Sequence, residues 1–547
     1  MESYPEITPE IRENMESKNI DVDLSLSILA AYNRGEYDHF EPITVQELPN
    51  VDGETVIDFT GTPSIRVSKA IARERLAALI PNAIANDLDR LANRVDGADL
   101  VFEKAALEEL GLLLLPRVAY GVLNGGSATS YADTTKNSKF SSELFELLGD
   151  TFGEMAELSR GRAKGLTPAF VQPDGSFGPS FLQLKMRNLL IMALRSKAAL
   201  ERHAPGSSES LPMPLLPFFQ MTSIHTDDEL AASYTDYRSD EPLADLIALT
   251  GLDPTDPEGG VQPLISAYTH GELGRPKQVF TKAWGRENET LPLPGGHGQS
   301  FWVLKDVYRR LHESGKRFVY LGNVDNLGFL PDPASIAYLA LSGKQAAFDF
   351  AYKTPVDVKG GILVKDQAGH LNCADIGPAV SKEDVAAAES AGKPILFNAA
   401  TGLFDLDYLV PNIERIIKEL PTRFTDQDKD AGRYSQAEQV TWEVLGMLDD
   451  FLVCCVSKWD RFLAAKLLSE TLMTSGIKIH DPSYPTSDDP AHDLKSTAEK
   501  LHDGLIRKLE GDYGMRRENG RWEPIPAAEV KARIESQDTP AKGSSAS

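Results

Sequence analysis

The stretch Arg-Phe-Val-Tyr-Leu-Gly-Asn-Val-Asp-Asn-Leu-Gly, residues 317–328, joins an apolar run to a short polar turn. The run RFVYLGN (317–323) predicts a buried strand, because apolar residues fill it and polar residues bound it. Asp325 follows this strand directly. Open α/β sheets bind their ligands at the carboxyl ends of the strands, and carboxylates suit hard cations. Asp325 is therefore a candidate metal ligand, and an Asx turn is the plainer alternative for this motif alone.

Similar apolar runs elsewhere predict the rest of a sheet. They are VAYGVL (118–123), PLLPFFQMTS (214–223) and PILFNA (394–399), and GILVKDQAGHL (361–371) predicts a hairpin. Helical spacing of apolar residues predicts helices at 181–200 and 300–311. This alternation of strands and helices indicates a parallel α/β sheet.

The two ends of the chain differ from this central pattern. Helical spacing, as in SKAIARERLAAL (68–79), predicts a helical N-terminal region, and 441–473 is helical or mixed. The polar end, DTPAKGSSAS, predicts a disordered tail. We therefore expect four parts, namely a helical N-terminal region (1–110), a catalytic domain (111–425), a C-terminal region (426–535) and the tail (536–547).

The composition limits the classes of function. A formal net charge of −25 disfavours a broad basic surface for nucleic acid, whereas a small phosphate ligand needs only a few local cations. The three cysteines, Cys373, Cys454 and Cys455, form no CxxC pair or spaced Cys/His cluster, so we expect reduced thiols and no zinc site. Without a basic, apolar leader or an apolar run of about 18–20 residues, we expect a soluble, cytoplasmic protein.

Two glycine-rich segments are candidate phosphate loops. LNGGSATS (123–130) follows a predicted strand, and its small residues allow the backbone to approach a ligand closely. It fits neither the Walker A pattern nor the dinucleotide fingerprint. LPGGHGQ (293–299) opens a predicted helix, whose N–H groups favour an anion. Ordinary turns are the alternative for each segment taken alone.

Taken together and in order, these motifs resemble the UDP-glucose pyrophosphorylase family. That family has the forms LNGGLGTS, PPGHGD, N-x-DNLG and FNTN, where this chain has LNGGSATS, LPGGHGQ, NVDNLG and FNAA (397–400). The resemblance also includes MTSIHTD (221–227), VKGG (358–361) and VSKWDRFLAAK (456–466), and it spans roughly residues 118 to 466.

The resemblance implies a Rossmann-like, GT-A-like nucleotidyltransferase fold with a mixed central sheet flanked by helices. It also implies a UTP:glucose-1-phosphate uridylyltransferase that uses Mg²⁺ and releases UDP-glucose and pyrophosphate. The sugar phosphate would attack the α-phosphate of UTP in line, and no general base is required because the nucleophile is already an anion. The alternatives are a UDP-sugar pyrophosphorylase that uses galactose 1-phosphate or an N-acetylhexosamine 1-phosphate, and an inactive UDP-sugar-binding regulatory protein.

Site residues follow from the resemblance position by position. The uracil and phosphates would meet Asn124, Gly125 and Gly126, with Gln262 at the uracil edge and Gly296 and His297 bordering the nucleotide. Asp325 would hold Mg²⁺, and the sugar-phosphate side would be lined by Asn323, Lys359, Gly360 and Asn398. Lys164 and Lys466 would supply the cations that stabilise the charge developing at the α-phosphate.

The chain also departs from the family pattern. Ser127 and Ala128 replace Leu-Gly in the glycine loop, and an insertion from about Tyr131 to Arg162 precedes Lys164. Lys136 or Lys139 is therefore an alternative source of the first cation. In the sugar pocket, Ala400 replaces an asparagine, and Asp375 is the counterpart of an acidic ligand for the sugar hydroxyls.

Overall fold

A ten-stranded mixed sheet forms the centre of the computed structural model, which describes residues 7–40, 43–206, 214–358, 360–377, 379–489 and 492–537. Eight strands follow in the order β1 (Val56–Asp58), β18 (Leu452–Cys455), β12 (Ala346–Tyr352), β15 (Leu396–Asp405), β11 (Phe318–Asn323), β5 (Val118–Leu123), β6 (Phe218–Ser223) and β7 (Glu258–Gln262). A hairpin of β13 (Gly361–Lys365) and β14 (Leu371–Asp375) joins through β15.

The four strands β11, β5, β6 and β7 are parallel, so their carboxyl ends share one edge of the sheet. The strand β15 runs antiparallel to both β11 and β12, which makes the sheet mixed. The mixed central sheet and the hairpin are confirmed, whereas the wholly parallel sheet that the strand pattern alone indicated is wrong, because β15 is antiparallel. Of the predicted strands, β6 begins only at Phe218, and β15 extends beyond its predicted end to Asp405.

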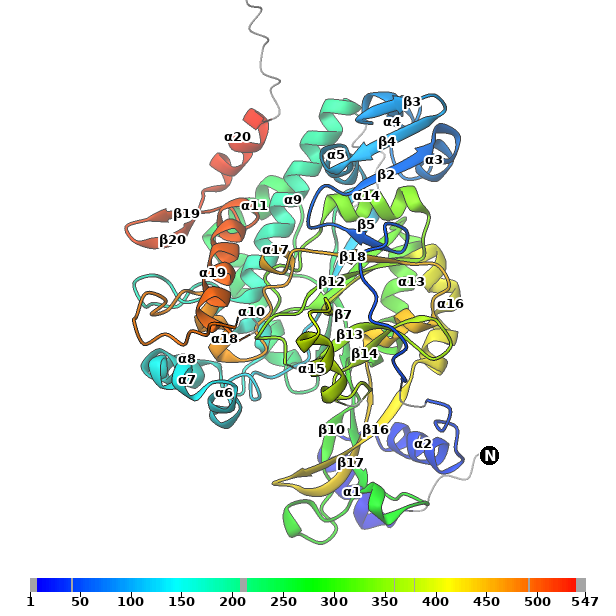
Figure 1. Ribbon diagram of the computed structural model, residues 1–547, viewed down its shortest axis with the longest axis vertical. Helices are drawn as coiled ribbons and strands as arrows, with labels where there is room; N and C mark the ends of the chain where they lie inside the picture. Colours follow the sequence, from blue (N-terminus) through cyan, green and yellow to red (C-terminus); the bar gives the residue numbers. More distant parts are fainter. Residues whose placement is uncertain are drawn as a thin grey trace, which may run out of the picture.

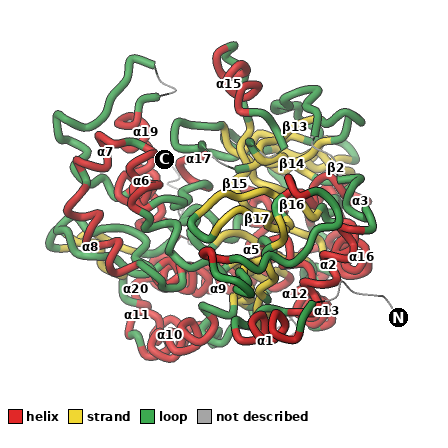
Figure 2. Tube along the Cα trace, turned by 90° about the horizontal axis from the view of Figure 1, so that it is seen from below, coloured by secondary structure: helices red, strands yellow, loops and turns green. Residues whose placement is uncertain are grey.

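Helices cover both faces of the sheet because the side chains of each strand alternate between them. Tyr120 and Tyr320 point into one core, against α5 (Lys104–Leu114), α9 (Phe181–His203) and α14 (Pro333–Ser342). Ala119 and Val319 point into another, against α12 (Ser300–Val303), α13 (Lys305–Glu313) and α16 (Leu406–Glu419). Figure 2 shows the strands at the centre with helices to the left, below and to the right of them. The helix predicted at 300–311 is divided at Leu304 into α12 and α13.

The N-terminal region is only partly helical, which amends the expectation for residues 1–110. Its helices are α1 (Pro9–Ser17), α2 (Val22–Asn33), α3 (Lys69–Leu76), α4 (Asn82–Ala85) and α5. However, β1 pairs with β18 in the central sheet, and β2 (Ser64–Ser68), β3 (Arg94–Asp96) and β4 (Asp99–Glu103) form a separate sheet. These strands need partners that lie far away or across turns, so helical spacing alone did not reveal them.

A smaller β unit lies at the lower end of the molecule in Figure 1 with α1 and α2. It contains β8 (Leu264–Ser266), β9 (Tyr268–Thr269), β10 (Pro292–Pro294), β16 (Thr422–Lys429) and β17 (Gly432–Gln439). Other helices between strands are α10 (Asp227–Ser239), α11 (Glu241–Thr250) and α15 (Lys382–Ser390).

The C-terminal part contains α17 (Lys458–Arg461), α18 (Leu468–Thr474), α19 (Leu494–Gly511), β19 (Met515–Glu518), β20 (Arg521–Pro524) and α20 (Ala527–Gln537). The segment 441–473 is mixed, since it holds a 3-10 helix, β18, α17 and most of α18. Residues 536 and 537 of the predicted tail belong to α20, and 538–547 lie outside the described residues. None of the helices within the described ranges is long and apolar enough to cross a membrane.

Candidate active site

The predicted site residues gather at the shared carboxyl edge of β11, β5, β6 and β7. Asn124 follows β5 directly, while Asn323 ends β11 and Gln262 ends β7. In the sheet, Leu123 of β5 pairs with Asn323 of β11 and with Met221 of β6. The residues that follow these three strands therefore lie close together at the edge of the sheet. This is the edge at which parallel α/β sheets bind ligands.

Asn124 is fully buried at the start of the glycine loop. Its backbone N–H donates to the carbonyl of Met221 at 2.8 Å, and its side-chain Nδ2 donates to Gln220 at 3.1 Å. Its Oδ1 has no hydrogen-bond partner among the described residues. Gly125 packs against the backbone of Thr222, and Gly126 has open space where a side chain would be. The loop therefore presents backbone and one unused acceptor beside the β5 edge.

The insertion after the glycine loop forms three short helices, α6 (Thr134–Phe140), α7 (Ser142–Leu147) and α8 (Gly149–Ser159). Its two ends meet, because the N–H of Ala128 donates to the carbonyl of Arg162 at 2.9 Å. The N–H of Lys164 then donates to the carbonyl of Gly126 at 3.0 Å. The chain therefore leaves the glycine loop at the start of the insertion and returns beside it at the end. As a result, Lys164 lies next to Gly126 despite the insertion.

Of the three lysines considered for the first cation, Lys164 lies against the predicted metal ligand. Its Nζ is 2.5 Å from Oδ2 of Asp325, and each side chain is 13% exposed. Nζ also donates to the carbonyl of Ala465 and lies 4.7 Å from the centre of the Tyr131 ring. Lys136 instead donates to Ser130 at 2.7 Å, and its side chain is exposed. Lys139 is also exposed, on α6.

Lys466 follows Ala465 in the chain, and its ammonium lies near Gly360, in the segment before β13. Its Nζ is 4.8 Å from the centre of the Phe397 ring. A Cβ added to Gly360 would come within 3.0 Å of this Nζ, and Gly360 has a φ of +142° that favours glycine. Residue 466 as a whole is exposed, but desolvation around its ammonium lowers the pKa of that group, against the attraction of Asp357. Lys359 lies outside the described residues.

Asn398 and Asp375 are neighbours on the β13–β15 side of the site. Oδ1 of Asn398 accepts the N–H of Ala400 at 2.9 Å, and its Nδ2 donates to Sγ of Cys373 at 3.4 Å. Burial raises the pKa of the Asp375 carboxyl, although the positive charges of Lys466 and Arg423 oppose the shift. This side therefore offers an amide and a carboxyl group, groups that bind sugar hydroxyls.

The second glycine-rich segment is tied to β7. Nε2 of Gln262 donates to the carbonyl of Gly296 at 2.8 Å and to Oε1 of Gln299 at 3.0 Å. Nδ1 of His297 accepts the backbone N–H of Thr441 at 3.1 Å. Burial, with the nearby charge of Lys466, lowers the pKa of His297 to about 4. His297 is therefore neutral at pH 7, with the proton on Nε2.

Only part of a Mg²⁺ site is present in the described chain. Those residues contain no group of three or more His, Cys, Asp or Glu side chains that could hold a metal ion. Asp325 has one oxygen on Lys164, and its Oδ1 has no hydrogen bond to any described residue. A single carboxylate fits Mg²⁺ if substrate phosphates and water supply the other ligands, which is the usual arrangement for this ion.

Several buried polar residues that support the site were not identified from the sequence. Arg461 lies between Asp332 at 2.7 Å and Asp349 at 2.6 Å, and so joins the start of α14, which follows the Asp325 loop, to β12. Lys185 and Tyr513 reach the backbone of the same loop from α9 and from the end of α19. Lys185 had a visible signal, a lysine within the apolar helix predicted at 181–200.

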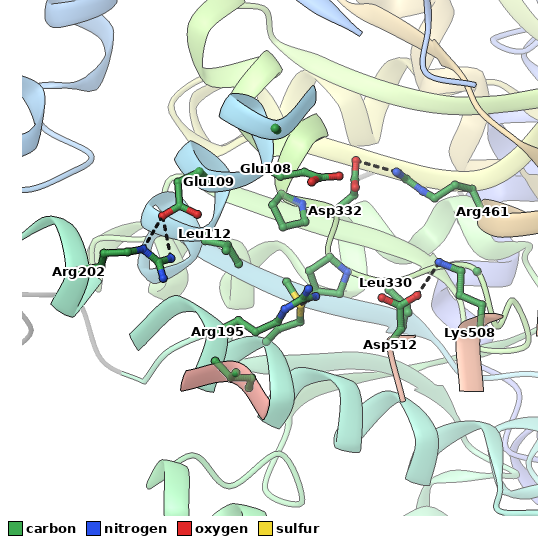
Figure 3. Close-up of a pocket in the computed structure, with 16 residues that line it drawn as sticks. Glu108, Glu109, Leu112, Arg195, Arg202, Leu330, Asp332, Arg461, Lys508 and Asp512 are labelled. Atoms are coloured by element: carbon green, nitrogen blue, oxygen red, sulfur yellow. Dashed lines mark hydrogen bonds and ion pairs between the residues drawn. The ribbon is translucent and has the colours of Figure 1, made fainter. Parts of the chain in front are cut away.

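A separate cavity of about 420 Å³ lies behind this loop. Figure 3 shows it with its ion pairs, which join Asp332 to Arg461, Asp512 to Lys508 and Glu109 to Arg202. None of the predicted site residues lines it. The candidate active site is thus the loop cluster at the carboxyl edge rather than this cavity.

Part of the chain is similar to one family of known proteins. Residues 277–481 match the family model UDPGP, described as UTP–glucose-1-phosphate uridylyltransferase. A protein of that description from Solanum tuberosum is 25% identical over 225 residues, which are 39% of this chain and 46% of the relative. The chain thus matches less than half the length of that relative.

Two solved structures from Trypanosoma brucei share the fold. A UDP-glucose phosphorylase has a TM-score of 0.51 and 16% identity, with 92% of this chain and 88% of that chain covered. A uridine diphosphate N-acetylglucosamine pyrophosphorylase in complex with an inhibitor has a TM-score of 0.55 and 16% identity, with 97% and 86% covered. At this identity the likeness establishes a shared mixed α/β fold, and it carries no information about the sugar.

Proposed function

We propose, from the premise that residues 277–481 carry the UDPGP family's domain, that the chain transfers a uridylyl group from UTP to a hexose 1-phosphate. The products would be a UDP-sugar and pyrophosphate. The observation that carries the proposal is the contact between Lys164 and Asp325 at the carboxyl edge, beside the glycine loop. A cation and a carboxylate in one place suit the neutralisation of phosphates, directly and through a metal ion.

The chain's own residues would align two anions. The glycine loop and Gln262 border the space for the nucleotide, while Asn398 and Asp375 border the space for the sugar. Lys164 and Lys466 flank Ala465 and would stabilise charge on the α-phosphate as the new bond forms. Asp325 would hold Mg²⁺, which when bound neutralises phosphate charge. No residue needs to remove a proton, because a sugar phosphate is already an anionic nucleophile.

Glucose 1-phosphate is the acceptor we propose, because LPGGHGQ around His297 resembles the form PPGHGD of the UDP-glucose pyrophosphorylase family. The closest alternatives are galactose 1-phosphate and an N-acetylhexosamine 1-phosphate. Asn398 is present, but Ala400 stands where the family has a second asparagine. One sugar contact is therefore replaced, and a panel of sugar 1-phosphates at fixed UTP is the direct measurement of preference.

The test of the reaction is pyrophosphate release from UTP, Mg²⁺ and glucose 1-phosphate, followed by a coupled assay. We expect release that requires all three components. A binding protein of the same fold would bind a UDP-sugar in calorimetry and release no pyrophosphate above background with any sugar of the panel. That second result would overturn the enzyme proposal and favour the regulatory alternative.

A further inference from the structure

The backbone carbonyls of the loop after β11 point into the protein, where each needs a donor. Three buried side chains supply them. Lys185 Nζ donates to the carbonyls of Asn326 at 2.8 Å and Phe329 at 2.9 Å. The hydroxyl of Tyr513 donates to the carbonyl of Leu327 at 2.7 Å, and that of Tyr120 donates to Phe329 at 2.7 Å. The loop that carries Asp325 is thus held from three elements.

Lys185 is an unusual residue for its position. It lies near the N-terminal end of α9 and is 1% exposed, and burial of an ammonium group is costly unless hydrogen bonds satisfy it. Here the ammonium group has three acceptors, because the Tyr120 oxygen lies at 3.2 Å in addition to the two carbonyls. The Phe329 ring lies 5.0 Å away. The full set of acceptors fixes Nζ directly beneath residues 326–329.

This arrangement bears on Asp325 because of its place in the chain. Asp325 precedes Asn326, whose carbonyl Lys185 holds, and the side chain of Asn326 donates to the carbonyl of Arg461 at 3.1 Å. Few degrees of freedom therefore remain for the carboxylate. Groups that orient a metal ligand typically change metal affinity by 10–100-fold when they are removed.

We propose that Lys185, together with the hydroxyl of Tyr513, is a positioning residue that holds the loop of Asp325 in the geometry needed to take up Mg²⁺ with the nucleotide. The inference rests on the proposed function for its Mg²⁺ part. The holding of the loop itself is a property of the free protein and can be measured without substrate.

A purely structural lysine is available in the same chain as a matched control. Lys316 is 2% exposed, and its Nζ donates to the carbonyls of Pro116 at 2.9 Å and Pro214 at 2.5 Å. It precedes β11, whereas Lys185 acts at the opposite end of that strand. Burial lowers the pKa of each lysine to about 7. Lys316→Met therefore removes a comparable buried ammonium far from the Asp325 loop.

The experiment compares Lys185→Met with Lys316→Met in the full chain. Hydrogen exchange of the amides of 324–330 is measured in the free protein, and Mg²⁺ is titrated in the pyrophosphate-release assay. We expect Lys185→Met to speed exchange in this loop at least about tenfold and to raise the half-saturating Mg²⁺ concentration about 10–100-fold. Lys316→Met should leave both unchanged and lower only the melting temperature. Equal loop exchange and equal Mg²⁺ dependence in the two variants would overturn the inference.

Tyr513→Phe keeps the test decisive if Lys185→Met does not fold. It removes only the hydroxyl that donates to Leu327, so we expect a few-fold faster exchange and a few-fold higher Mg²⁺ requirement. Wild-type values of both in a folded Tyr513→Phe protein would refute the role of its hydroxyl. If the wild type releases no pyrophosphate, the proposed function fails, and the exchange data still decide whether Lys185 holds the loop.

Discussion

Replacement of Asp325 by Asn tests the central contact of the proposed site. The amide has the size of the carboxylate and can still form hydrogen bonds, but it carries no charge. Its partner Lys164 would keep its bond to the carbonyl of Ala465 and its place over the Tyr131 ring. The substitution therefore removes one negative charge from a site 13% exposed, with little change in shape.

The expected magnitudes separate stability from catalysis. Removing one member of a partly buried ion pair costs several kcal/mol of stability when the other charge is left without a partner. Because Lys164 keeps two other interactions, we expect the free energy of unfolding to fall by only about 1–2 kcal/mol. A domain with about 5–15 kcal/mol of stability stays folded after such a loss. For turnover, loss of one charge-stabilising group typically reduces kcat by about 10²–10³.

The assay is pyrophosphate release at saturating UTP and glucose 1-phosphate, with melting temperatures measured in parallel. Asp405→Asn is the matched control, because Asp405 is also a carboxylate in an ion pair, with Arg317 at 2.8 Å. It lies at the end of β15 that is farthest from the site residue Asn398. We expect the control to keep its turnover within about twofold, as changes far from the site usually do. If Asp325→Asn also stays within about threefold of the wild type, the proposed role of this carboxylate is wrong, since that corresponds to under 1 kcal/mol.

Three further substitutions test other parts of the site. Lys466→Met should lower kcat about 10²-fold with an unchanged melting temperature, and turnover near the wild type would exclude its role as a cation for the α-phosphate. His297 has a pKa lowered to about 4, so between pH 6.5 and 4 the unfolded chain binds a proton that the folded chain does not. The free energy of unfolding should therefore fall by about 3 kcal/mol as the pH falls through this window, and His297→Gln, measured by urea titration, should remove that fall. An identical pH dependence in the variant would contradict it. Gly296 has a φ of +82°, and a Cβ there would collide with the carbonyl of Gln439, so Gly296→Ala should cost at least about 2 kcal/mol. An unchanged urea midpoint would count against that strain.

The central strands could be predicted because they are buried on both faces. The run at 118–123 becomes β5 without a change of bounds, and 317–323 becomes β11 from Phe318. The extension of β15 could not be predicted, since the segment AATG (399–402) has small residues with little strand preference. It is a strand because β11 and β12 pair with it on both sides. Pairing between distant segments is the information that a local pattern lacks.

Much of the site could be predicted for a related reason. Parallel strands bring Asn124 and Asp325 to one edge wherever the two strands are neighbours. The choice among the lysines could not be made from the sequence, because it depends on how the insertion folds and where its ends return. Lys185 could not be assigned either. Its place in a mostly apolar helix marks it in the sequence as unusual, but only the position of the Asn326 carbonyl reveals its partner.

The contact between Lys164 and Asp325 also bears on how an acidic protein could accept a nucleotide. With a net charge of −25, the chain as a whole repels anions, so attraction must come from groups close to the site. Removing charged groups from water is costly, but folding has already removed most of the water from Lys164 and Asp325 and placed them in contact. On binding, Lys164 would turn to a phosphate and Asp325 to Mg²⁺, so each charge would exchange one partner for another. The cost of desolvating them would then fall on folding rather than on the binding step.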